Sequence, residues 1–171
     1  MASSTVGVAI GILFAVTGVH GCASSTDDSS VPSPVGAGVT SSSSEPFTRL
    51  LSAVTSGFTE PAELVLRDEA ALANAWRTLN NGVPGNPAPT VDFSKKMVVL
   101  LALGQRNTGG YAVRFDSMTV DGGIPRVSYT VTSPGASCAT TQMLTSPVDV
   151  VTLPLSAAQV RFTARKVVQD C

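Results

Sequence analysis

The sequence predicts a small α+β domain, in which one main helix packs on an antiparallel-rich sheet that forms a half-open barrel or a sandwich. Three observations favour this class. Two segments of alternating apolar and polar residues, 111–120 and 126–133, flank an Asp-Gly-Gly turn. An uninterrupted apolar run covers 96–104, and apolar residues at helical spacing follow Asp68. Since a single segment carries the helical period, strands are expected to supply most of the core.

The helix is expected directly after Asp68, whose side chain can cap it, while Glu69 favours its positive end. Leu72, Trp76 and Leu79 recur on one helical face before Asn-Asn-Gly ends the pattern. A large aromatic ring on that face gives extensive apolar contact. We therefore predict that Trp76 is a core residue.

Strands are expected wherever apolar residues alternate or run together between turn signals. The continuous run at 96–104 predicts a central strand that is buried on both faces. The alternation after Tyr111 slips at Asp116 and Ser117, which predicts a β-bulge. The Asp-Gly-Gly turn predicts a hairpin into the next strand. The expected strands are 47–58, 63–68, 96–104, 111–120, 126–133, 148–153 and 159–168.

The N-terminal part differs in composition from this domain. The uncharged apolar run from Val6 to Val19 is too short to span a bilayer comfortably, and small residues follow it. This pattern predicts a signal peptide over 1–21. The sequence Val-His-Gly-Cys that ends at Cys22 resembles the lipobox of bacterial lipoproteins, which implies that Cys22 is lipidated and becomes the mature N-terminus. An uncleaved anchor, or a non-lipoprotein signal cut nearby, is the alternative.

Residues 22–44 predict a disordered tether, because the stretch after Cys22 is rich in Ser, Pro and Gly and offers almost nothing to bury. As a flexible coil it would hold the domain on the order of 25 Å from the lipid. We therefore expect the folded domain over 45–171. The predicted location is the bacterial cell envelope, at the outer membrane or cell surface, with a lipid as the membrane anchor.

Composition and charge exclude several chemistries. The balance of 11 basic against 12 acidic residues gives no field that would attract nucleic acid. His20 is the single histidine, so the mature domain lacks an imidazole for a Ser/His/Asp triad or a His-containing zinc site. No segment groups the acidic residues into a calcium loop. We expect no enzyme, no metal and no cofactor. A carboxylate pair that forms on folding remains the enzymatic alternative.

Two cysteines, Cys138 and Cys171, remain once Cys22 is assigned to the lipid. Exported proteins keep disulfides, so we expect these two to pair. Closing this loop would stabilise the fold by roughly 3 to 4 kcal/mol in the chain-entropy model and would hold the C-terminus. Two unpaired thiols are the alternative.

The segment Gly-Gln-Arg-Asn-Thr-Gly-Gly over 104–110 is the candidate site. It lacks the Gly-Lys-Ser/Thr ending of a phosphate-binding P-loop, and it leads into a strand, so it lacks the helix N-terminus that makes such loops bind phosphate. Its glycines permit positive φ, and we expect its polar side chains to point outward. A bare hairpin connection is the alternative. The predicted partner-binding residues are Arg106, Asn107, Thr108, Gly109, Gly110 and Tyr111.

Several motifs resemble the C-terminal domain of the PrcB family, whose members are lipoproteins known as subunits of a bacterial surface protease complex. The resemblance covers roughly 76–162, and Thr-Gly-Gly-Tyr is its most distinctive part. The family usually has Pro after its Arg, where this chain has Asn107. The matching positions are Val91, Asp92, Phe93, Gly104, Thr108 to Tyr111, Pro134, Gly135, Cys138, Thr145 to Pro147, Val160 and Phe162.

The same loop is similar, more weakly, to a Thr-Thr-Gly loop of chagasin-like inhibitors of cysteine proteases, with Gly109 in place of the second Thr. From these resemblances we expect an exported, lipid-anchored accessory protein that binds a protein partner, a surface or envelope protease, through 106–111. A direct protease inhibitor of the chagasin-like loop type is the first alternative. A carboxylate-based enzyme is the second.

Overall fold

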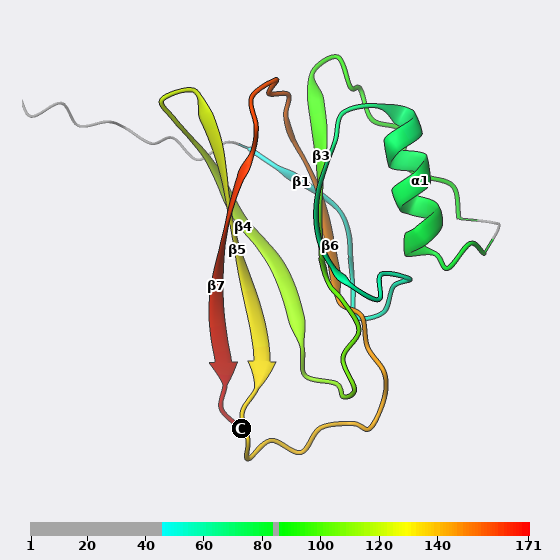
Figure 1. Ribbon diagram of the computed structural model, residues 1–171, viewed down its shortest axis with the longest axis vertical. Helices are drawn as coiled ribbons and strands as arrows, with labels where there is room; N and C mark the ends of the chain where they lie inside the picture. Colours follow the sequence, from blue (N-terminus) through cyan, green and yellow to red (C-terminus); the bar gives the residue numbers. More distant parts are fainter. Residues whose placement is uncertain (1–45, 84–85) are drawn as a thin grey trace, which may run out of the picture. The chain divides into compact units, whose positions relative to one another are not determined.

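The computed structural model describes residues 46–83 and 86–171, so the predicted signal peptide, lipid site and tether lie outside the described part. The fold is mostly β with one short helix, which confirms the α+β prediction (Figure 1). The elements are β1 (Thr48–Ala53), β2 (Pro61–Leu66), α1 (Glu69–Leu79), β3 (Lys96–Leu103), β4 (Ala112–Asp121), β5 (Ile124–Pro134), β6 (Val148–Pro154) and β7 (Arg161–Gln169).

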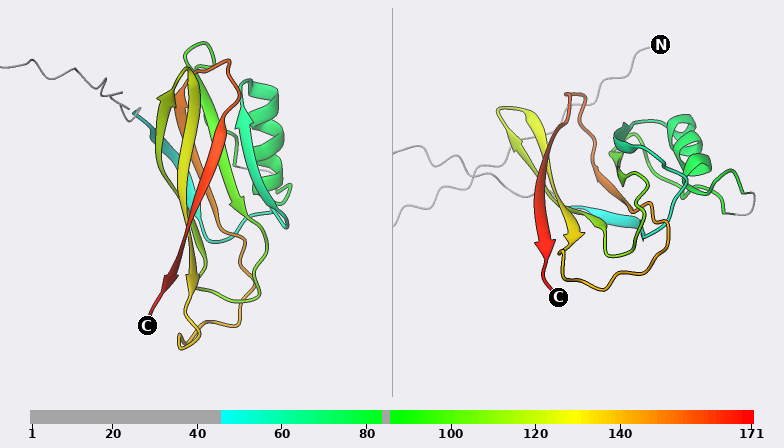
Figure 2. Two further views of the ribbon diagram at one scale, coloured as in Figure 1. Left: turned by 60° about the vertical axis from the view of Figure 1, so that its left-hand side comes forward. Right: turned by 60° about the horizontal axis from the view of Figure 1, so that its bottom comes forward.

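The strands form two open sheets. The four-stranded sheet has the order β1-β6-β3-β2, and each neighbouring pair in it is antiparallel. The three-stranded sheet has the order β4-β5-β7, in which β4 pairs with β5 antiparallel and β5 pairs with β7 parallel. The helix α1 covers one face of the four-stranded sheet, and the three-stranded sheet covers the other (Figures 1 and 2). The sheets thus form a sandwich rather than a barrel.

The strand β3 lies inside the four-stranded sheet and is buried on both faces, as its apolar run predicts. Met97 and Leu101 belong to the core between the two sheets, whereas Val98 and Leu100 belong to the core beneath α1. Successive side chains of a strand point to opposite faces, so one continuous apolar run serves both cores. Full burial of one such side chain stabilises the fold by about 1.5 to 3 kcal/mol.

The helix forms as its capping pattern predicts. The Asp68 carboxylate accepts a hydrogen bond from the Ala71 backbone N–H at 2.7 Å, which satisfies an otherwise unpaired donor of the first turn. Leu72, Trp76 and Leu79 are buried on the face that packs on the sheet. The Trp76 indole N–H donates to the Asn86 backbone oxygen at 3.0 Å. Trp76 is therefore a core residue, as predicted.

The hairpin of β4 and β5 contains the predicted bulge. Its register shifts between Phe115 and Ser117, so Asp116 has no opposite residue in the backbone register of β5. Gly122 and Gly123 both have positive φ, 56° and 79°, in the turn between these strands. The slip in the alternation was thus a correct sign of an extra residue in the strand.

Candidate functional site

The loop 104–111 connects the two sheets. It leaves β3 in the four-stranded sheet and enters β4 in the three-stranded sheet (Figure 1). The alternative of a bare hairpin connection is therefore wrong, because β3 and β4 are not paired strands. Crossing from one layer of a sandwich to the other needs more residues than a tight turn. The length of the loop follows from this crossing.

The segment 134–147, which connects β5 to β6, holds the backbone of the loop in place. Arg106 and Thr145 form an isolated β-bridge, with backbone nitrogen-to-oxygen distances of 2.7 and 2.9 Å. The Gly109 N–H donates to the Thr141 oxygen at 3.0 Å. The buried Thr145 hydroxyl donates to the Thr108 oxygen at 2.9 Å. Hydrogen bonds at Arg106, Thr108 and Gly109 thus fix the path of the loop.

The two adjacent glycines of the loop are required for different reasons. Gly110 has φ 89°, and a Cβ there would lie 3.0 Å from Pro134 Cβ. Gly109 lies outside the positive-φ region, so the expectation of positive φ is right for Gly110 and wrong for Gly109. A Cβ at Gly109 would instead collide with the Thr141 hydroxyl oxygen. Both glycines allow the loop to approach the segment 134–147 closely.

Among the predicted binding residues, Asn107 is exposed, whereas Arg106, Thr108 and Tyr111 are half-buried. The Arg106 guanidinium donates to the Leu103 backbone oxygen at 2.9 Å and lies 5.6 Å from the centroid of the Tyr111 ring. Cation–π contact and this hydrogen bond turn the side chain back onto the loop. The expectation that all the polar side chains of the loop point outward is therefore wrong for Arg106 and holds for Asn107.

The structure places two exposed apolar residues beside this loop that the sequence interpretation missed. Met143 and Leu144 are 51% and 59% exposed. Their backbone is held nearby, since Thr145 bonds to Arg106 and the Ser146 N–H donates to the Val54 oxygen at 3.0 Å. The sequence offered one sign of this exposed apolar pair, namely two bulky apolar residues inside an otherwise polar connection. We call residues 105–111 and 139–146 together the loop end.

A shallow cavity of about 240 Å³ adjoins the loop end. Pockets that bind drug-sized ligands or cofactors generally measure about 300 to 1,000 Å³. The cavity is therefore smaller than this range. Its lining includes Gly110, Pro134, Cys138, Thr141 and Cys171.

Cys138 and Cys171 form a disulfide, which confirms the predicted pairing. The Gly135 N–H also donates to the Gln169 oxygen at 2.9 Å. Both contacts attach the end of β7 to the segment that supports the loop. A structural disulfide is typical of a protein that folds outside the cytoplasm.

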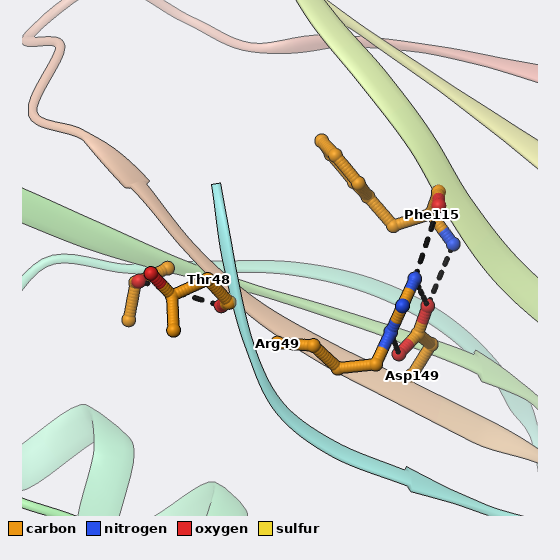
Figure 3. Close-up of polar contacts among 5 residues, drawn as sticks. Thr48, Arg49, Phe115 and Asp149 are labelled. Carbon is orange, nitrogen blue, oxygen red and sulfur yellow. Dashed lines mark hydrogen bonds and ion pairs between the residues drawn. The ribbon is translucent and has the colours of Figure 1, made fainter. Parts of the chain in front are cut away.

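A second polar contact between the sheets, which we call the bulge junction, joins Arg49, Phe115 and Asp149 (Figure 3). Asp149 is fully buried, and its carboxylate accepts hydrogen bonds from Arg49 Nε at 2.8 Å and from the Phe115 N–H at 2.7 Å. The Nη2 group of Arg49 donates to the Phe115 backbone oxygen at 3.2 Å. The hydrogen bond to Asp149 raises the pKa of Arg49. The sequence interpretation missed this contact, whose one sign is an Asp inside the apolar strand β6.

Other carboxylates are also engaged within the protein. The Asp92 carboxylate accepts from the Ser94 hydroxyl and backbone N–H, and these bonds lower its pKa. The Tyr129 hydroxyl donates to Glu63 at 2.5 Å across the two sheets. Burial, together with this carboxylate, raises the pKa of Tyr129 to about 12. Within 46–83 and 86–171, no group of three or more His, Cys, Asp or Glu could hold a metal ion.

Residues 97–154 match the family model described as PrcB C-terminal, which is not a known catalytic family. The match runs from β3 to β6 and includes both the loop 104–111 and the segment 134–147. It confirms the resemblance found in the sequence over residues 97–154. No curated protein and no solved structure matches the chain. No helix of the described part is long and apolar enough to cross a membrane.

Proposed function

We propose that this protein, whose residues 97–154 belong to the PrcB C-terminal family, is an exported accessory protein that binds a protein partner through its loop end. One observation carries the proposal. The backbone of the loop is held by Thr141 and Thr145, while the side chains of Asn107, Met143 and Leu144 are left exposed. A backbone that is already held loses little further conformational entropy when a partner covers the exposed side chains.

A protease of the cell surface or envelope is the partner that we propose. The family resemblance supports this choice, because its members are known as subunits of a surface protease complex. The disulfide supports the same location, since the partner must also lie outside the cytoplasm. The size of the cavity at the loop end favours a protein side chain as its occupant.

An accessory role fits the geometry better than direct inhibition. An inhibitory loop has to extend into a substrate cleft, whereas here Gly109 and Thr145 tie the loop to the segment 134–147. Arg106 is turned back onto Tyr111 and Leu103. The loop end is accordingly a broad surface that suits contact with the outside of a folded partner.

A lipid on Cys22 would keep the protein and its partner at one membrane. Labelling cells with a fatty-acid analogue tests this part of the proposal. Wild type should incorporate the label and Cys22→Ser should not. Equal labelling of both proteins would show that Cys22 is not the lipid site.

Photo-crosslinking in the intact envelope tests the loop end directly. A photoreactive residue at Asn107 should crosslink one protease, which mass spectrometry identifies. The same residue at Arg77, which is exposed on α1, is the matched control and should not capture that protease. The protease alone should keep its activity when the purified protein is added, because the proposed role is accessory. Equal capture from both positions would contradict the assignment, and loss of activity would favour the inhibitor.

A further inference from the structure

The outer edge of β7 differs from the other sheet edges of the domain. The edge strands β1 and β2 have six residues each, and β1 has a register shift after Arg49. The edge strand β4 contains the bulge, where the Phe115 N–H is already bound to Asp149. In contrast, β7 has nine residues, all paired with β5 in one continuous register. It is the longest regular edge among the described strands.

Every second backbone N–H and C=O of an edge strand points away from its sheet and is free to pair with another chain. No described helix or strand runs along the outer side of β7 (Figures 1 and 2). The far end of the strand is anchored, because Gln169 bonds to Gly135 and Cys171 is linked to Cys138. The edge is therefore preformed and does not need to be ordered by a partner.

The charges on β7 select which chain can pair with it. Arg161, Arg165 and Lys166 are exposed, and β7 contains no acidic residue. Arg165 and Lys166 point to opposite faces, so cations flank the edge on both sides. Arg165 donates to the Thr130 hydroxyl, and this hydroxyl donates to the Asp116 carboxylate. None of the three cations lies within ion-pair distance of a carboxylate in the described part of the chain.

Pairing of β7 with a second copy of itself would bring these cations together, which is unfavourable. An acidic strand would instead place a carboxylate opposite each cation. We propose that the outer edge of β7 binds an extended acidic segment of another protein, which adds as a fourth strand to this three-stranded sheet. This surface is separate from the loop end, so the inference does not depend on the function proposed above.

The test uses the purified full chain and synthetic peptides of nine residues, the length of β7. The acidic peptide alternates glutamate with valine or threonine, and the control peptide has lysine at each glutamate position. Fluorescence anisotropy should show at least about tenfold tighter binding of the acidic peptide. Arg161→Glu with Lys166→Glu should weaken that binding by about tenfold or more. The control charge reversal, Arg77→Glu, lies on α1, which packs on the face of the four-stranded sheet opposite the sheet of β7, and it should leave the affinity within about twofold.

Backbone methylation separates strand pairing from simple charge attraction. Two versions of the acidic peptide are methylated on alternate sets of backbone nitrogens. One set faces β7 in a paired strand and the other faces solvent, so one version should lose binding and the other should keep it. If both versions bind like the unmethylated peptide, or if the acidic and basic peptides bind alike, the proposal is wrong.

Two further results would replace the proposed occupant with another. Sedimentation could show that wild type is a dimer that Arg161→Glu with Lys166→Glu dissociates, in which case β7 pairs with a second copy. Asp27 and Asp28 are the two acidic residues of the predicted tether. Asp27→Asn with Asp28→Asn could increase the affinity for the acidic peptide, in which case this part of the chain itself occupies the edge. A monomeric wild type and an unchanged affinity support a separate acidic partner.

Discussion

The bulge junction and the loop end both link the four-stranded sheet to the three-stranded sheet, but they expose different groups. At the bulge junction, the Asp149 side chain is fully buried, and Arg49 and the Phe115 backbone satisfy it. At the loop end, hydrogen bonds hold the backbone, while the side chains of Met143 and Leu144 remain largely exposed.

The comparison shows that two connections between the same layers leave different groups exposed. Buried charges stabilise a fold only while their partners are present, so a change at the bulge junction must affect stability. An exposed side chain on a well-held backbone contributes little to stability and remains free for a partner. Substitutions should therefore separate the two regions, with stability lost at the first and binding lost at the second.

The largest effect is expected from Arg49→Ala. The substitution leaves the fully buried Asp149 carboxylate with the Phe115 N–H but without its positive partner. Leaving a buried charge without its partner costs about 3 to 5 kcal/mol in the free energy of unfolding. Urea denaturation measures it. Asp121→Ala, which removes an exposed 3.4 Å pair with Arg126, is the control and should cost about 1 kcal/mol or less.

The second effect is expected at the disulfide that supports the loop end. Cys138→Ser with Cys171→Ser should lower the free energy of unfolding by roughly 3 to 4 kcal/mol, because the unfolded chain regains the entropy of an open loop. The loss should be about the same size when wild type is denatured with a reducing agent. A double variant as stable as oxidised wild type would show that the loop end is held by its hydrogen bonds alone.

A smaller loss of stability is expected for Gly110→Ala. The new Cβ meets both an unfavourable positive φ and the ring of Pro134, so we expect a loss of about 1 to 3 kcal/mol. Gly122→Ala shares the positive φ, but a Cβ there has no neighbour within 4 Å. Thermal melts should therefore show the greater destabilisation for Gly110→Ala. Equal losses would mean that φ alone matters and that contact with Pro134 is unimportant.

Local patterns in the sequence predict the elements whose signals are themselves local. The apolar run of β3, the capping of α1 by Asp68 and the phase slip at Asp116 each led to a confirmed prediction. These features depend on the spacing of neighbouring residues, which is directly visible in a sequence.

The contacts between distant segments were not predictable in this way. Arg49 and Asp149 are 100 positions apart, and only the folded chain shows that they meet at the bulge. The path of the loop 104–111 depends on which sheet each flanking strand joins, and strand patterns do not specify the partner. Arg106 turns inward because of Tyr111 and Leu103, so its charge alone wrongly indicated an exposed residue.

The central claim, that the loop end binds a partner while its backbone is held by the domain, is tested most directly by Asn107→Ala combined with Met143→Ala and Leu144→Ala. Each change at these exposed positions should alter the free energy of unfolding by about 0.5 kcal/mol or less. The affinity for the crosslinked protease should fall by at least about tenfold, since interface anchors typically contribute more than 1 kcal/mol each. Val83→Ala, at an exposed apolar residue after α1, is the control and should change neither quantity. A triple variant that melts like wild type and binds the protease as tightly as wild type would contradict the account.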